Sequence, residues 1–183
     1  MIAGGESYYS LIHKPRTSEC KVSSCSDDLV YDPEGGLRLF PYGALDTHFS
    51  QRGRSGRLIR LAAHSDIDLA FGVDETTGLY VKEYDDRTEF EVFGKYGVNL
   101  FNMKETVLSN GDDFKIKNVK WSYFTVGDKI TLHADGSLSC EIAPYKYEIE
   151  ETKASPLTST DVFSSPDRPE GRDNYMEFVI LGQ

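Results

Sequence analysis

One short stretch of the chain gathers several groups that can do chemistry. Residues 45–58 contain the acid Asp46, the imidazole of His48 and three arginines, Arg52, Arg54 and Arg57. Clustered arginines suit a carboxylate or phosphate ligand, because the planar guanidinium binds those anions through two parallel hydrogen bonds. A solvated helix surface that carries a few arginines is the alternative. Because an acid and an imidazole lie beside the cluster, we interpret the stretch as a site.

A second stretch supplies a carboxylate that could act on the histidine. Residues 71–81 run from apolar residues through Asp74 and Glu75 to another apolar segment. This pattern predicts a buried strand, an acidic turn and a second strand. Hydrolases orient an imidazole base with a carboxylate placed in this way. Taken alone, the stretch is better explained as an ordinary acidic turn, so its meaning depends on His48.

Together the two stretches resemble the cyanophycinase-like serine peptidases, a family that also holds the aspartyl dipeptidases. The family motif D-Q-H-F-x-x-R-x-R-x-x-R-L is matched by residues 46–58, with Thr47 in place of the Gln. The family motif G-[IV]-D-E-x-T is matched by residues 72–77. Both motifs occur in the family's order and separation, and a weaker likeness covers residues 1–133.

The resemblance implies an α/β fold and a division of the chain. The fold would be a portion of a three-layer domain similar to class I glutamine amidotransferases, β-rich in its second half. Residues 1–133 would form the C-terminal half of the catalytic domain, and residues 134–183 a C-terminal extension. The family's nucleophile is a Ser in a G-T-S-A-G elbow, and no G-x-S-x-G occurs in this sequence. Because residues 1–7 resemble the segment after the elbow, we expect the chain to begin downstream of the nucleophile and do not assign that role to Ser7.

The resemblance also implies roles for the site residues. His48 would be the general base and Glu75 the acid that orients it, with no metal or cofactor. The substrate would be an aspartyl or arginyl peptide such as cyanophycin, a polyaspartate with arginines on its side chains. The substrate-binding positions would be Asp46, Thr47, Arg52, Arg54 and Arg57. The arginines would bind free carboxylates and the acid a substrate guanidinium, while the change from Gln to Thr47 leaves the substrate preference open.

Three interpretations of the chain remain open at this point. The first, which we favour, is a part of a serine-type exopeptidase whose nucleophile lies outside this sequence. The second is a shortened homologue that binds aspartyl or arginyl peptides without cutting them. The third is an unrelated, acidic, β-rich domain whose arginines bind a phosphate group, in which His48 and Glu75 need not be close.

Composition limits the classes of partner. The chain has 183 residues, a formal net charge of −10 and 39% hydrophobic residues. This length and apolar content predict a globular domain with a sizeable core. The negative charge argues against general binding to nucleic acid or to membrane surfaces. No signal peptide or membrane span is predicted, so we expect a soluble protein, cytoplasmic or secreted, and a homodimer is left open.

Periodicity predicts where the site residues lie along the fold. Residues 7–36 read as an irregular insertion, in which Cys20 and Cys25 are either a disulfide or two free thiols. Apolar residues at helical spacing predict a helix over 55–64. Alternating and β-branched residues predict strands over 37–40, 78–84, 89–93, 98–103, 115–126, 129–133 and 140–150. The base would therefore precede a helix, and the acid would lie between two strands.

Overall fold

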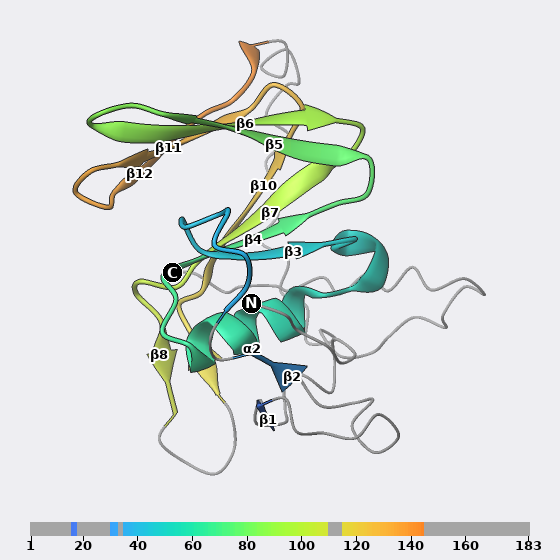
Figure 1. The fold of residues 1–183 in the computed structure, drawn as a ribbon, viewed down its shortest axis with the longest axis vertical. Coiled ribbons are helices and arrows are strands. Elements are labelled where there is room, and N and C mark those ends of the chain that lie inside the picture. Colours follow the sequence, from blue (N-terminus) through green and yellow to red (C-terminus); the bar gives the residue numbers. More distant parts are fainter. Residues whose placement is uncertain (1–15, 18–29, 33–34, 110–114, 145–183) are drawn as a thin grey trace, which may run out of the picture.

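The central layer of the protein is a four-stranded mixed sheet. The computed structural model describes residues 16–17, 30–32, 35–109 and 115–144. The sheet has the order β10-β7-β4-β3 (Figure 1). Its members are β3 (Ala44–Thr47), β4 (Leu69–Val73), β7 (Gly97–Asn102) and β10 (Lys120–Thr125). The pair β3 and β4 is parallel, whereas the other two pairs are antiparallel.

A helix connects the two parallel strands and covers one face of the central sheet. The connection consists of a 3₁₀ turn, η1 (Ser50–Arg52), followed by α2 (Ser55–His64), so the predicted helix over 55–64 is confirmed. Parallel neighbours need such a crossover, because the chain must return to the starting edge of the sheet. Buried apolar residues on α2, among them Leu58, Ile59 and Ala62, pack with Ala70 of β4 and Phe101 of β7.

A second sheet, antiparallel throughout, packs on the other face of the central sheet (Figure 1). Its order is β12-β11-β6-β5. Its strands are β5 (Thr77–Glu83), β6 (Arg87–Gly94), β11 (Lys129–His133) and β12 (Leu138–Glu141). Alternate residues of β4, such as Leu69 and Phe71, join a core with Phe90 and Ile130 of this sheet, while Ala70 belongs to the helix side. All of β4 is therefore buried, as expected of a strand that is covered on both faces.

The α/β class and the β-rich second half agree with the prediction, but two predicted strands were wrong. Residues 37–40 form no strand, because Arg38 has a left-handed φ of 57° and the side chains of Leu37 and Leu39 are exposed. The predicted strand over 115–126 is divided into β9 (Ile116–Lys117) and β10. Asn118, with φ 62°, lies between the two parts. A left-handed residue ends a strand because it turns the backbone out of the extended conformation.

The second sheet continues across the boundary that was expected at residues 133/134. Strand β12 pairs with β11, and the backbone N–H of the buried Ala143 donates to the Asp128 carboxylate at 2.9 Å. Strand β12 thus belongs to the same sheet as β11, while Cys20, Cys25 and residues 145–183 lie outside the described part.

Two short strand pairs complete the described elements. Strand β1 (Arg16–Thr17) pairs with β2 (Val30–Tyr31), and β8 (Val107–Leu108) pairs with β9. Over the described ranges, no helix has both the length and the apolar character that a membrane crossing requires.

Candidate functional site

The structure brings His48 and Glu75 together, as the sequence predicted. His48 follows β3 directly, and Glu75 lies in the turn between β4 and β5. Because β3 and β4 are parallel neighbours with Thr47 opposite Val73, their carboxyl ends meet at the same edge of the sheet. The Nδ1 atom of His48 lies 2.9 Å from Oε1 of Glu75. A carboxylate only accepts hydrogen bonds, so Nδ1 carries the proton and donates it.

The backbone around this pair adopts an uncommon conformation. His48 has φ 49° and Thr76, which follows Glu75, has φ 53°. Left-handed backbone at residues other than glycine is disfavoured, more so for a β-branched residue such as Thr76. Such conformations persist only where the surrounding contacts hold them, and they concentrate at functional sites.

A series of hydrogen bonds fastens the segment that carries His48 to the turn that carries Glu75. The backbone N–H of Phe49 donates to the carbonyl of Val73 at 3.3 Å. The N–H of Ser50 donates to the Asp74 carboxylate at 2.9 Å. In the opposite direction, the N–H of Glu75 donates to the side-chain carbonyl of Gln51 at 3.1 Å. These three bonds extend the pairing of β3 with β4 past the strand ends and so fix the relative position of base and acid.

A close contact between Phe49 and Gly72 helps to position His48, which precedes Phe49 in the chain. Phe49 is fully buried, and its ring lies over Gly72 of β4. A Cβ atom added at Gly72 would lie 2.3 Å from the ring, far inside van der Waals contact. The Phe of the first motif and the Gly of the second therefore fit together, and both act on the position of the neighbouring histidine.

A buried polar network supports the same region, and the sequence analysis assigned it no role. Asp74 is only 4% exposed and accepts hydrogen bonds from the Ser50 N–H, from the Tyr123 hydroxyl at 2.8 Å and from the Gly97 N–H at 3.4 Å. The equally buried Asn99 donates to the Ser50 hydroxyl at 3.2 Å. The one available signal was an acid that follows a wholly apolar strand, since such an acid must be buried with its partners.

The predicted anion-binding cluster is largely a buried ion-pair cluster. Arg57, on the first turn of α2, donates to both carboxylate oxygens of Asp46 at 2.6 Å. Arg54 donates through Nη1 to Asp46 at 3.2 Å and to the carbonyl oxygen of Thr47 at 2.6 Å. The Asp46 and Arg57 side chains are 10% and 8% exposed. Two of the three arginines thus converge, but they converge on an acid of the protein.

Unlike the nearly buried ion-pair cluster, Arg52 and Thr47 lie at the surface. Both residues are exposed. Burial lowers the pKa of the Arg54 guanidinium, and the positive charges of Arg57 and, to a smaller extent, Arg52 lower it further, so Arg52 lies near the cluster. Within the part of the chain that the structure describes, the Arg52 side chain makes no hydrogen bond or ion pair. Of the three arginines, Arg52 is therefore the one whose guanidinium has no partner in the described residues and is available to a ligand.

The second ring nitrogen of His48 is not occupied by a neighbouring group in the described part of the chain. Nε2 has no hydrogen-bond partner among the described residues, and the His48 and Glu75 side chains are 54% and 46% exposed. A neutral ring that donates from Nδ1 keeps a lone pair on Nε2 and can accept a proton there. The nearby Ser50 hydroxyl bonds to Asn99 and not to His48, so it is not placed as a nucleophile.

Neither a metal-binding group in the described residues nor the family comparison adds an assignment to this site. No group of three or more His, Cys, Asp or Glu side chains in these ranges is arranged to hold a metal ion. The sequence matches no protein-family model. A functional assignment must therefore come from the geometry of His48 and Glu75 and from the motifs that carry them.

Proposed function

We propose that this chain supplies the general base and its orienting acid to a cyanophycinase-like serine-type peptidase built on a class I glutamine amidotransferase-like domain. The hydrogen bond from Nδ1 of His48 to Glu75, with Nε2 left available, is the observation that supports this proposal most. A serine-peptidase base needs this polarity, because the acid must hold Nδ1–H while Nε2 takes the proton of the nucleophile. The two sequence motifs, over residues 46–58 and 72–77, are the reason for proposing this particular family.

In the proposed reaction, His48 takes up and returns one proton in acylation and a second proton in deacylation. The serine oxygen attacks the carbonyl carbon of an aspartyl peptide bond while Nε2 of His48 takes the hydroxyl proton. The tetrahedral adduct then collapses, the C–N bond breaks, and His48 returns that proton to the leaving amine. Water then attacks the acyl-enzyme while the same nitrogen takes a proton from it, and His48 passes this second proton to the serine oxygen as the ester bond breaks. Glu75 remains ionised throughout and stabilises the imidazolium form.

The contacts in the arginine cluster modify the roles proposed for substrate binding. A substrate guanidinium at Asp46 would compete with Arg57, which already donates to both oxygens of that nearly buried acid. We therefore assign Asp46 and Arg57 to positioning the loop before α2. Arg52 is the best candidate for binding a substrate carboxylate, and Arg54, which uses only Nη1 in the described contacts, is the second. Thr47 can contact the substrate through its exposed side chain.

The test of this proposal is dipeptide release from cyanophycin by two proteins. The chain alone, which has no G-x-S-x-G elbow, should release no β-aspartyl-arginine above background. A protein in which the in-frame upstream segment with a G-T-S-A-G elbow precedes Met1 should release it at an enzymatic rate. Replacing that elbow Ser by Ala is the control for contaminating activity. Robust turnover by the chain alone, or an upstream segment without an elbow, would contradict the proposal.

A second function is favoured by one observation, the absence of an elbow motif from this sequence. A homologue without a nucleophile would keep the pocket and bind aspartyl or arginyl peptides without cutting them. Saturable binding of β-aspartyl-arginine together with the absence of an upstream elbow would establish this alternative in place of the peptidase.

A further inference from the structure

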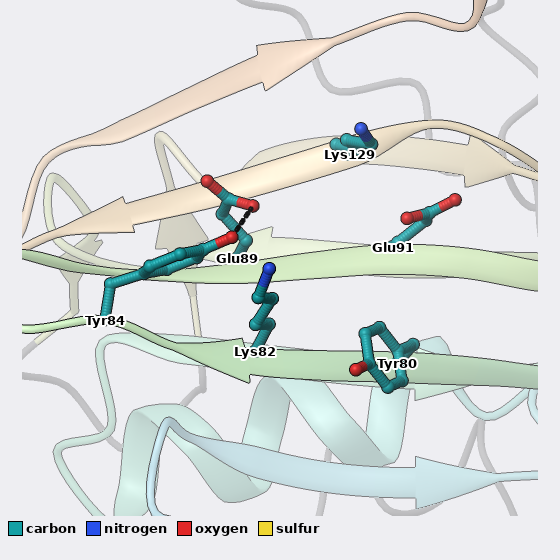
Figure 2. A pocket seen from close by; sticks show the side chains of 6 residues that line it. All are labelled: Tyr80, Lys82, Tyr84, Glu89, Glu91 and Lys129. Atoms are coloured by element: carbon teal, nitrogen blue, oxygen red, sulfur yellow. Dashed lines mark hydrogen bonds between the residues drawn. The ribbon is translucent and has the colours of Figure 1, made fainter.

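The outer face of the second sheet carries a shallow pocket away from the His48 site. Six side chains from β5, β6, β11 and the turn after β5 line a volume of about 250 Å³ (Figure 2). We call these residues the outer platform; they are Tyr80, Lys82, Tyr84, Glu89, Glu91 and Lys129. Tyr80 is 58% exposed. The platform combines aromatic rings, ammonium groups and carboxylates on one face.

Strand alternation explains why these side chains share a face. Successive side chains of a strand point to opposite sides of its sheet. On β5, Leu79 and Val81 pack against the core between the two sheets, so Tyr80 and Lys82 point outward. On β6, the buried Phe90 lies between Glu89 and Glu91. The platform is therefore fixed by the same pattern that forms the core.

The pairing register places opposite charges side by side. Glu91 of β6 lies opposite Tyr80 of β5 on one side and opposite Lys129 of β11 on the other. Cross-strand neighbours of opposite charge ordinarily pair. In the described residues, however, the side chains of Glu91 and Lys129 form no ion pair or hydrogen bond with each other or with another side chain, and Figure 2 draws no interaction between them. The carboxylate of Glu91, the ammonium of Lys129 and the ring of Tyr80 thus form one row across three strands and are available to a ligand.

The neighbouring row is held rigid by internal contacts. The Tyr84 hydroxyl donates to Glu89 at 3.2 Å, and the Arg87 Nε donates to the same carboxylate at 2.8 Å. Lys82 and Arg87 lie over the Tyr84 ring, at 4.8 Å and 4.1 Å from its centre. The hydrogen bond from Arg87 is the main cause that lowers the pKa of Glu89, so this acid stays charged. The Tyr84 ring already binds cations of the protein, which shows that its surroundings suit a guanidinium.

We propose that the outer platform is an accessory binding site for a polymer whose repeating unit carries both a guanidinium and a free carboxylate, as cyanophycin does; this inference rests on the proposed function. Glu91 binds the guanidinium, Tyr80 stacks on its plane, and Lys129 binds the carboxylate of the same unit. A purely anionic or purely cationic polymer would meet one repelling charge in this row.

The platform is placed to act together with the His48 site. Strand β5 begins at Thr77, two residues after Glu75, and Tyr80 follows along the same strand. At about 3.3 Å per residue, the three steps from Thr77 to Tyr80 place Tyr80 roughly 10 Å along β5 from the turn that carries the proposed catalytic acid. A polymer that spans both positions would be held near the base after each cleavage, which raises its local concentration there.

The experiment measures binding of the 183-residue chain to immobilised cyanophycin. The Glu91→Gln/Lys129→Gln double variant and the Tyr80→Ala variant should each bind about tenfold more weakly, because each loses contacts of the row. The matched control is Glu105→Gln/Lys120→Gln, which removes the same two kinds of charge from an exposed ion pair on β10 and the segment before β8. This control should bind as the unchanged chain does. Soluble polyaspartate should compete poorly, and soluble arginyl-aspartate oligomers well.

Two outcomes would overturn the inference, and they are separable from failure of the proposed function. The inference fails if the unchanged chain does not bind the polymer, or if the platform and control variants bind it equally. A His48→Ala variant should still bind, because the platform does not include the base. Intact binding without cleavage by the elbow-containing protein would contradict the peptidase alone, whereas cleavage with unchanged binding by the platform variants would contradict the platform alone.

Discussion

In the protein that carries the elbow Ser, changing His48 to Ala should reduce dipeptide release from cyanophycin to background. The expected loss in kcat is on the order of 10⁶-fold, as found when the base of a serine-peptidase triad is removed. Changing Glu75 to Gln should cost less, about 10⁴-fold, because the ring remains but loses the carboxylate that holds its tautomer and stabilises its charged form. Steady-state release of the dipeptide measures both effects.

A second histidine of the chain provides a matched control for these variants. His133 lies on β11 of the second sheet, where its Nε2 atom is 2.8 Å from the Ser139 hydroxyl. Changing His133 to Ala removes a half-buried imidazole from a place that the mechanism does not use, so kcat should be unchanged. If His48→Ala and His133→Ala had equal activity, His48 would not be the base.

Changing Asp46 to Ala should give the largest loss of stability among the site residues. The side chain is 10% exposed and receives two hydrogen bonds from Arg57 and one from Arg54. Its removal leaves a nearly buried guanidinium without its main counter-charge, which typically costs about 3–5 kcal/mol in the free energy of unfolding. For a chain of this size, that corresponds to a fall in Tm of roughly 10 °C. Thermal unfolding followed by circular dichroism measures it.

An exposed ion pair in the same protein calibrates this effect. Asp86 accepts a hydrogen bond from Arg87 at 2.9 Å, but its side chain is 74% exposed. Changing Asp86 to Ala should therefore alter the free energy of unfolding by less than about 1 kcal/mol. Equal destabilisation by the two changes would show that Asp46 does not hold the arginines in place and would restore its assignment as a ligand for the substrate.

The parts of the fold that sequence predicted well are those with a local pattern. The helix over 55–64 follows from apolar residues at helical spacing, which no left-handed residue interrupts. The pairing of His48 with Glu75 followed from two motifs at the ends of neighbouring strands. The helix could be predicted from the spacing of neighbouring residues, and the contact of His48 with Glu75 from the order of the two motifs.

The remaining features depend on partners that are distant in sequence. The Asp46 carboxylate reads equally well as a ligand for a substrate and as a partner for Arg57, and only the return of α2 beneath β3 decides between them. The role of Asp74 requires the hydroxyl of Tyr123, which another strand delivers. Residues 37–40 alternate like a strand, but the backbone turns at Arg38 and leaves their leucines exposed.

The tautomer of His48 tests the central claim most directly, and it can be measured on the chain itself. In ¹⁵N-labelled protein at a pH where the ring is neutral, two-bond ¹H–¹⁵N correlations show which ring nitrogen carries the proton. The account requires the proton on Nδ1 and the lone pair on Nε2, because Nδ1 lies 2.9 Å from the Glu75 carboxylate. In the Glu75→Gln variant the proton should shift toward Nε2. A His48 ring protonated on Nε2 in the unchanged chain, or a tautomer that does not respond to Glu75→Gln, would contradict the account.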